Sequence, residues 1–118
     1  MTLRVAISAG LLALAASGAQ AEFAKVESQS DFVRLIDGKT LSRPLIRLQV
    51  HADGRIEGRG AGWDVSGSWR WRNGYFCRDL SWGGDDLGYN CQEVRAYGRK
   101  VRFTSDRGEG DSADFRLR

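Results

Sequence analysis

Hydrophobic and polar residues alternate one by one along residues 62–72, which is the spacing of a half-buried β-strand. Asn73-Gly74 follows at once, and Asn-Gly between alternating runs favours a type I′ hairpin turn because both central residues need positive φ. We therefore expect residues 75–82 to return antiparallel, and the glycine-rich stretch 83–88 to lead into a third strand over 89–97. The inward face of the first strand is predicted to carry Trp63, Val65, Gly67, Trp69 and Trp71.

The same alternation predicts four more short strands, over residues 45–51, 55–60, 99–106 and 112–118. All the connections are short, so an antiparallel up-and-down β-barrel or sandwich of seven to eight strands is the expected fold, because closure removes exposed edges. Residues 40–43 are interpreted as a connector, and Pro44 as the first or edge residue of a strand. In the strand over 55–60, Gly58 and Gly60 are interpreted as space for Trp63 and Trp69.

One short helix is predicted within residues 22–39. Ser30-Asp31 would begin it, an apolar stripe of Phe32, Leu35 and Ile36 would face the sheet, and Gly38 would end it. A helix of two to three turns is marginal in water by itself, so we expect it to plug one end of the barrel.

The two cysteines, Cys77 and Cys91, lie almost symmetrically about the turn at residues 83–88. Strand pairing with these cysteines opposite each other would place Asp79 opposite Tyr89 and Tyr75 opposite Glu93, and would allow a cross-strand disulfide. A reactive thiol is the alternative, but it needs a basic partner, and the single histidine, His51, is remote in sequence.

Residues 1–21 have the pattern of a secretory signal peptide, with Arg4, an apolar run over 5–16, and Ala19-Gln20-Ala21 before the cut. Cleavage would leave a single β domain over residues 22–118. The apolar run is too short for a comfortable membrane span of about 20 residues. We therefore expect a product in the periplasm or outside the cell, monomeric, without a membrane span in its mature form.

Charge adds little to this picture. The chain has 18 basic and 15 acidic residues and a net charge of +3. Basic and acidic residues are interspersed along the chain, which is typical of a solvated outer face of mixed charge. This pattern and the export signal predict no nucleic-acid partner.

No motif predicts catalysis, a cofactor or a metal. GRGAG at residues 58–62 lacks the strand-turn-helix context of a dinucleotide site, and two cysteines with one histidine do not make a zinc site. Asp79 and Glu93 are a candidate acid pair. The alternative is that they are ordinary members of the mixed-charge surface of the sheet. The aromatic residues beside turns, Trp71, Tyr75 and Trp82, are the candidate ligand-binding residues.

Five segments of the chain, RPLIRLQV, GRGAGWDVSGSWRW, GYFCRDLSW, LGYNC and RFTSDRGEGDSADFRL, resemble a group of small exported alphaproteobacterial proteins. The resemblance covers nearly the whole mature chain and implies export and paired cysteines. Members often carry the label dihydrodipicolinate reductase. That enzyme begins with a Rossmann half, where this chain has a signal-like segment, and none of its catalytic motif positions can be matched here.

Three functions follow as expectations. The first is a non-catalytic barrel that binds a small ligand or an envelope partner. The alternatives are an enzyme, either a reductase as in that label or a hydrolase, and a module that docks on or inhibits another protein. A deep aromatic cavity would favour the first. A cleft that holds Asp79, Glu93 or His51 with convergent polar groups would favour the second, and a filled barrel with a flat exposed aromatic patch the third.

Overall fold

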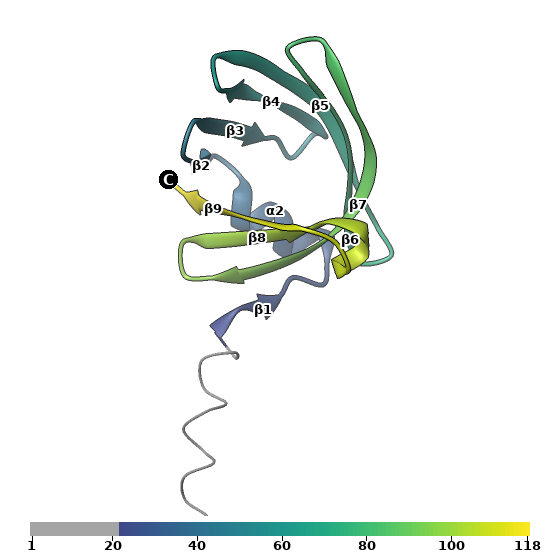
Figure 1. The fold of residues 1–118 in the computed structure, drawn as a ribbon. Coiled ribbons are helices and arrows are strands. Elements are labelled where there is room, and N and C mark those ends of the chain that lie inside the picture. The colour runs from purple at the N-terminus through teal and green to yellow at the C-terminus, as the bar shows by residue number, and fades with distance from the viewer. Residues whose placement is uncertain (1–21) are drawn as a thin grey trace, which may run out of the picture.

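The computed structural model describes residues 22–118 as an antiparallel β-barrel of eight strands (Figure 1). The predicted signal peptide, residues 1–21, lies outside the described residues. Each barrel strand pairs with the next along the chain, and the last strand pairs with the first, so the predicted up-and-down barrel is confirmed. The barrel strands are β2 (Leu41–Arg43), β3 (Ile46–Val50), β4 (Arg55–Gly60), β5 (Trp63–Arg72), β6 (Tyr75–Trp82), β7 (Asp85–Tyr97), β8 (Lys100–Thr104) and β9 (Ser112–Leu117). A further short strand, β1 (Ala24–Lys25), pairs with β7.

The strand that closes the barrel was predicted wrongly as a connector. Residues 41–43 form β2, in which Leu41 pairs with Leu48 of β3 on one side and Leu117 of β9 on the other. Pro44 does not begin a strand, but stands with Leu45 in the turn between β2 and β3. Leu45 takes a φ of 70° and is 80% exposed. A strand of three residues is too short to show an alternation that sequence reasoning can detect.

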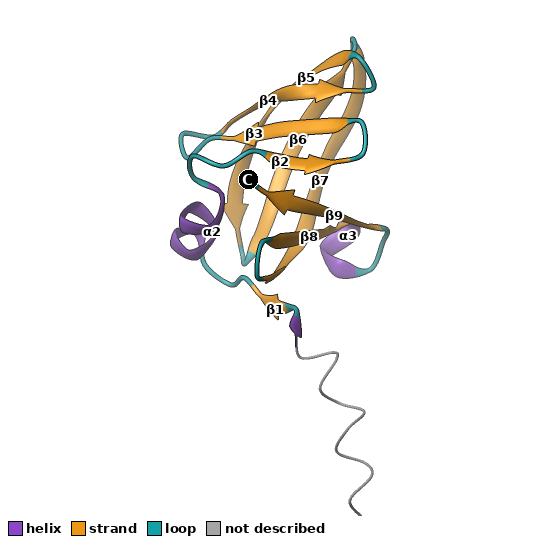
Figure 2. Ribbon diagram, turned by 90° about the vertical axis from the view of Figure 1, so that its left-hand side faces the viewer, coloured by secondary structure: helices purple, strands orange, loops and turns teal. Residues whose placement is uncertain are grey.

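Helix α2 (Gln29–Ile36) plugs one end of the barrel, as predicted, and Figure 2 shows it opposite the short helix α3 (Ser105–Gly108). The helix begins at Gln29 rather than at Ser30-Asp31, because Ser28 is the N-cap: its Oγ accepts a hydrogen bond from the backbone N of Asp31 at 3.1 Å. Two residues of the helix, Phe32 and Ile36, have fully buried side chains. We call the two ends of the barrel the α2 end and the α3 end.

Two strand boundaries near the α3 end differ from the predictions. Helix α3 replaces the end of the strand expected over residues 99–106, and Asp106 and Arg107 take positive φ there. Strand β7 begins at Asp85 rather than at residue 89, so the β6–β7 turn is only Gly83-Gly84. A register shift after Leu80 absorbs one extra residue, Leu87.

Two interpretations of inward-facing positions also need correction. Trp69 is 5% exposed in the core, but Trp63 is 60% exposed, because it begins β5 at the α3 end and its side chain lies against the turn at Gly83. The glycines of β4 do not make room for Trp63 and Trp69. A Cβ on Gly58 would meet the backbone oxygen of Arg47 at 2.1 Å, and the nearest atom to a Cβ on Gly60 would be Nε1 of Trp82 at 3.4 Å.

Candidate functional site

The barrel contains a cavity of about 240 Å³ that extends from the apolar core toward the α3 end. Its walls are mostly apolar side chains that point inward from six strands: Leu41, Leu48, Val50, Ile56, Phe76, Leu80, Phe103, Ala113 and Phe115. The polar lining residues are Arg78, Gln92, Ser105, Asp111 and Ser112. An apolar cavity with a few polar groups is the usual form of a small-molecule site, although this one is smaller than the common range of about 300–1,000 Å³.

Arg78 is the charged residue that β6 contributes to this cavity. It alternates with Phe76 and Leu80, so the pleat of β6 points it inward between two apolar side chains. Its Nη1 donates a hydrogen bond to the backbone oxygen of Gly88 at 2.8 Å. Burial lowers the pKa of the guanidinium, and neighbouring Asp79 opposes that shift. Arginine nevertheless remains charged at neutral pH, so the cavity holds a positive charge.

Arg78 has no carboxylate partner among residues 22–118 at ion-pair distance. Asp111 also borders the cavity, but its side chain is exposed at the α3 end and makes no ion pair with Arg78 in the described chain. A guanidinium has five N–H donors, and one of them is used by Gly88. Several N–H donors of this cavity-lining guanidinium therefore have no hydrogen-bond acceptor among residues 22–118.

The predicted disulfide between Cys77 and Cys91 is present, and the described chain has no free cysteine. The predicted register is confirmed in part, because Cys77 pairs with Cys91 and Asp79 with Tyr89. The bond lies on the outer wall, where Tyr75 and Tyr89 also line a surface hollow. The cysteines are therefore part of the wall of the barrel and do not line the interior cavity.

The three candidate ligand-binding aromatics occupy three separate places. Trp71 stacks on Phe32 of α2, with ring centroids 5.2 Å apart, so it belongs to the packing of the α2 end. Tyr75 is on the outer wall, with Lys25 Nζ 5.6 Å from its ring centroid. Trp82 is at the α3 end of β6 and donates from Nε1 to the oxygen of Gly60 at 2.7 Å. These residues do not form one shared aromatic site.

Two of the candidate acid–base residues, Glu93 and His51, contact local polar partners, and Asp79 forms no ion pair among residues 22–118. Glu93 pairs with Thr104 of β8, and the β6–β7 ladder ends at Phe76 with Gln92, so the expected pair of Tyr75 with Glu93 is not part of it. Glu93 accepts a hydrogen bond from Arg95 Nε at 2.8 Å. That hydrogen bond lowers the pKa of Glu93, which is the opposite of what a general acid needs. His51 Nε2 lies 2.6 Å from Glu57 Oε2. In the described residues, no group of three or more His, Cys, Asp or Glu side chains could hold a metal ion.

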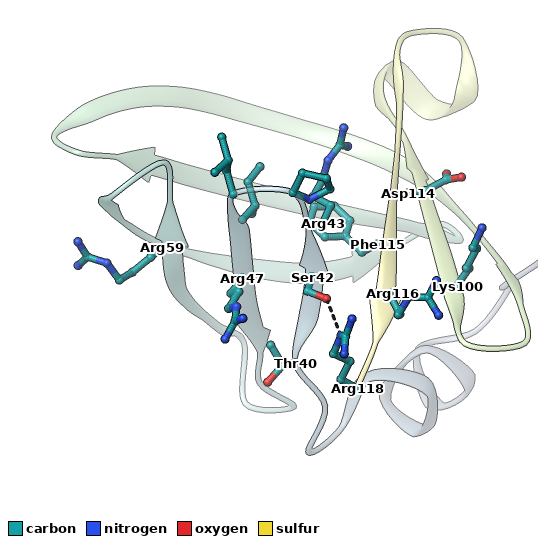
Figure 3. A pocket seen from close by; sticks show the side chains of 13 residues that line it. Thr40, Ser42, Arg43, Arg47, Arg59, Lys100, Asp114, Phe115, Arg116 and Arg118 are labelled. Atoms are coloured by element: carbon teal, nitrogen blue, oxygen red, sulfur yellow. Dashed lines mark hydrogen bonds between the residues drawn. The ribbon is translucent and has the colours of Figure 1, made fainter.

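The outer wall carries a second hollow, which sequence reasoning missed (Figure 3). It has a volume of about 980 Å³, and most of its charged lining residues are basic: Arg43, Arg47, Arg59, Lys100, Arg116 and Arg118, with Asp114 as the acidic member. The sequence shows no block of like charge because these residues come from five different strands and the chain end. Each is flanked along the chain by residues that point elsewhere.

Comparisons of the chain with protein-family models, with curated proteins and with solved structures found no match. The resemblance to small exported proteins therefore stays an expectation. No helix among the described residues is long and apolar enough to cross a membrane.

Proposed function

We propose that this chain is an exported, non-catalytic binding protein that holds a small, largely apolar molecule inside its barrel. The observation that carries the proposal is the position of Arg78 in an apolar cavity without a carboxylate partner in the described chain. A partly buried, unpaired charge costs stability, so its place is better explained by an anionic ligand than by folding. The ligand class is a small apolar carboxylate or a similar monoanion.

The size of the cavity limits the ligand further. A volume of about 240 Å³ corresponds to roughly eight water molecules at liquid density. This suits molecules such as hexanoate, octanoate or benzoate and is too small for a nucleotide or a long-chain lipid. The apolar walls would contact the hydrocarbon part, while the free N–H donors of Arg78 would bind the carboxylate.

The access route supports the same arrangement. The α2 end is filled by the aromatic side chains around Phe32. The cavity is instead bordered by Ser105, Asp111 and Ser112 at the α3 end, and Asp111 and Ser112 are exposed there. A ligand would therefore enter beside α3 with its apolar part first or would be enclosed by a movement of that segment.

Ligand binding is tested by comparing octanoate with 1-octanol, which has the same chain and no charge. Hydrogen bonds to a charged group contribute about 1.5–3 kcal/mol, so octanoate should bind roughly ten- to a hundredfold more tightly. Isothermal titration calorimetry on protein that has been freed of co-purified ligand gives both affinities. Equal affinities for the two compounds, or no binding of either, would contradict the proposal.

Arg78→Met and Arg78→Lys are the matched variants for this test. The methionine variant keeps an unbranched side chain in the cavity and should lose the preference for octanoate over 1-octanol. The lysine variant keeps the positive charge but lacks the planar guanidinium. Its preference for octanoate should therefore lie between that of the unaltered protein and that of the methionine variant. Near-ultraviolet circular dichroism shows whether the core of each variant is intact. A methionine variant that is folded and still prefers octanoate would show that Arg78 does not hold the anion.

Export is the other half of the proposal and has its own test. The Cys77–Cys91 bond supports it, because structural disulfides persist in oxidising compartments such as the periplasm. Expression of the full chain in a Gram-negative host should give a periplasmic protein that begins at Glu22, as measured by intact mass spectrometry. A product that stays in the cytoplasm and retains residues 1–21 would contradict export without affecting the cavity.

A further inference from the structure

We infer that the outer wall of the barrel carries a second binding site, a strip of cations that binds a flexible, linear polyanion through its phosphate or carboxylate groups. The strip consists of Arg59, Arg47, Arg118, Arg116 and Lys100, and none of these residues lines the interior cavity. The inference does not rest on the proposed ligand of the cavity.

The register of the sheet places these residues in one continuous row. Arg59 of β4 pairs directly with Arg47 of β3, and Arg47 pairs with Ser42 of β2. Ser42 in turn pairs with Arg116 of β9, and Arg116 pairs with Lys100 of β8. Ser42 is the uncharged residue in this row, and Arg118 places a cation beside it, because its Nε donates a hydrogen bond to the Ser42 Oγ at 3.2 Å. Figure 3 shows this order across the wall from Arg59 to Lys100.

Most of these cations are not neutralised within the described chain. Arg59 forms an ion pair with Asp64 at 2.6 Å, whereas Arg47, Lys100, Arg116 and Arg118 have no ion pair among residues 22–118. Asp114, the acidic residue in the same hollow, is held by Arg102 through two hydrogen bonds of 2.7 and 3.0 Å. Those bonds lower the pKa of Asp114, and its carboxylate is therefore already paired with Arg102.

Folding alone does not explain this row. Like charges that are directly opposite on neighbouring strands destabilise a sheet, and the strip contains two such pairs, Arg47 with Arg59 and Lys100 with Arg116. All four side chains are exposed, so they make no contribution to the core. An anion that bridges neighbouring cations would relieve the repulsion, and arginine is the residue best suited to bind carboxylate or phosphate oxygens with two parallel hydrogen bonds.

The shape of the strip favours a flexible chain over other polyanions. Strands are about 4.8 Å apart, so the strip is on the order of 19 Å long. It crosses five of the eight strands of a closed barrel, or about half the circumference. A flat membrane surface cannot touch both ends at once. Single-stranded nucleic acid is bound by aromatic side chains that stack on bases, and the row contains none.

Inorganic polyphosphate and polygalacturonate are the probes, one for each kind of anionic group. Binding is measured by calorimetry at several salt concentrations. If most of the five cations contact the chain, the logarithm of the association constant should fall against the logarithm of salt concentration with a slope of about −3. Arg47→Ser combined with Arg116→Ser should reduce the affinity on the order of tenfold or more and reduce the size of the slope by about one.

The matched control is Arg70→Ser combined with Arg72→Ser on β5. Both residues are exposed, and the variant loses the same net charge outside the strip. It should bind the probes nearly as well as the unaltered protein, and octanoate binding should be unchanged in both double variants. Binding of both polymers, or of one, would support the strip and identify the anionic group. Binding of neither, equal losses in the two double variants, or much tighter binding to single-stranded DNA or phosphatidylglycerol vesicles would overturn it.

Discussion

Replacement of Cys77 and Cys91 by alanine should lower the melting temperature of the barrel by well over ten degrees. The bond joins residues separated by 14 positions, and the chain-entropy estimate for a loop of about 15 residues is ~3 kcal/mol. Domains of this size are stable by only ~5–15 kcal/mol, so the loss is a large fraction of the total. Since ~1 kcal/mol shifts the melting temperature of such a domain by about 4–8 °C, the expected change is easy to measure by thermal unfolding.

The double variant should still fold, because the β6–β7 ladder and the core remain. Ser66→Ala with Ser81→Ala is a suitable control, since these residues are also directly paired on neighbouring strands but are not bonded. It should melt within a few degrees of the unaltered protein. Two titratable thiols in the native exported protein, or an unchanged melting temperature of the cysteine variant, would contradict this prediction and support the alternative of a reactive thiol.

The central strands were predictable from the sequence because local signals agree with one another there. The alternation over residues 62–72, the Asn73-Gly74 turn and the placement of the two cysteines each indicate the same hairpins. The capped helix was predictable for the same reason, since the apolar residues Phe32 and Ile36 share one face. Strand β2 was not, because its place depends on β9, which lies at the other end of the chain.

The candidate sites were largely beyond sequence reasoning for a different reason. Arg78 has a recognisable signal, because it stands at a spacing of two between Phe76 and Leu80 in the inward phase of β6. The residues singled out on this strand, Tyr75, Cys77 and Asp79, belong to the opposite phase, and Tyr75 and Cys77 line a hollow on the outer wall. The cation strip has no signal along the chain, since Arg59, Arg47, Arg116 and Lys100 become neighbours only through the strand register of the closed barrel.

The fold also separates the two proposed sites, because neighbouring residues on a strand point to opposite sides of the wall. On β3, Leu48 faces the interior cavity and Arg47 joins the outer strip. A change to one side of the wall can therefore leave the other side intact. This is why Arg47→Ser combined with Arg116→Ser serves as a folding control for the cavity, and Arg78→Met serves as one for the strip.

The second large effect is expected from Phe32→Ala, which should destabilise the domain by about 3–5 kcal/mol. Phe32 is fully buried, and its ring lies 5.1 Å from that of Phe76 and 5.2 Å from those of Trp69 and Trp71, measured between centroids. Its removal would leave a cavity where α2 meets the barrel, and a short helix without that contact has little stability of its own. The loss is a large part of ~5–15 kcal/mol, so the variant should unfold at much lower urea concentration.

Arg34→Ala tests whether the effect belongs to the buried ring or to the helix as a whole. Arg34 is on the same helix, with its side chain 72% exposed and paired with Asp31 on the surface, and such pairs contribute about 0.3–0.5 kcal/mol. Its urea midpoint should therefore stay close to that of the unaltered protein, while that of Phe32→Ala falls. If both variants unfold alike, α2 does not plug the barrel through Phe32. If Phe32→Ala is destabilised but keeps its octanoate affinity at low temperature, the binding cavity is closed independently of the helix, because its lining comes from the strands and the α3 segment.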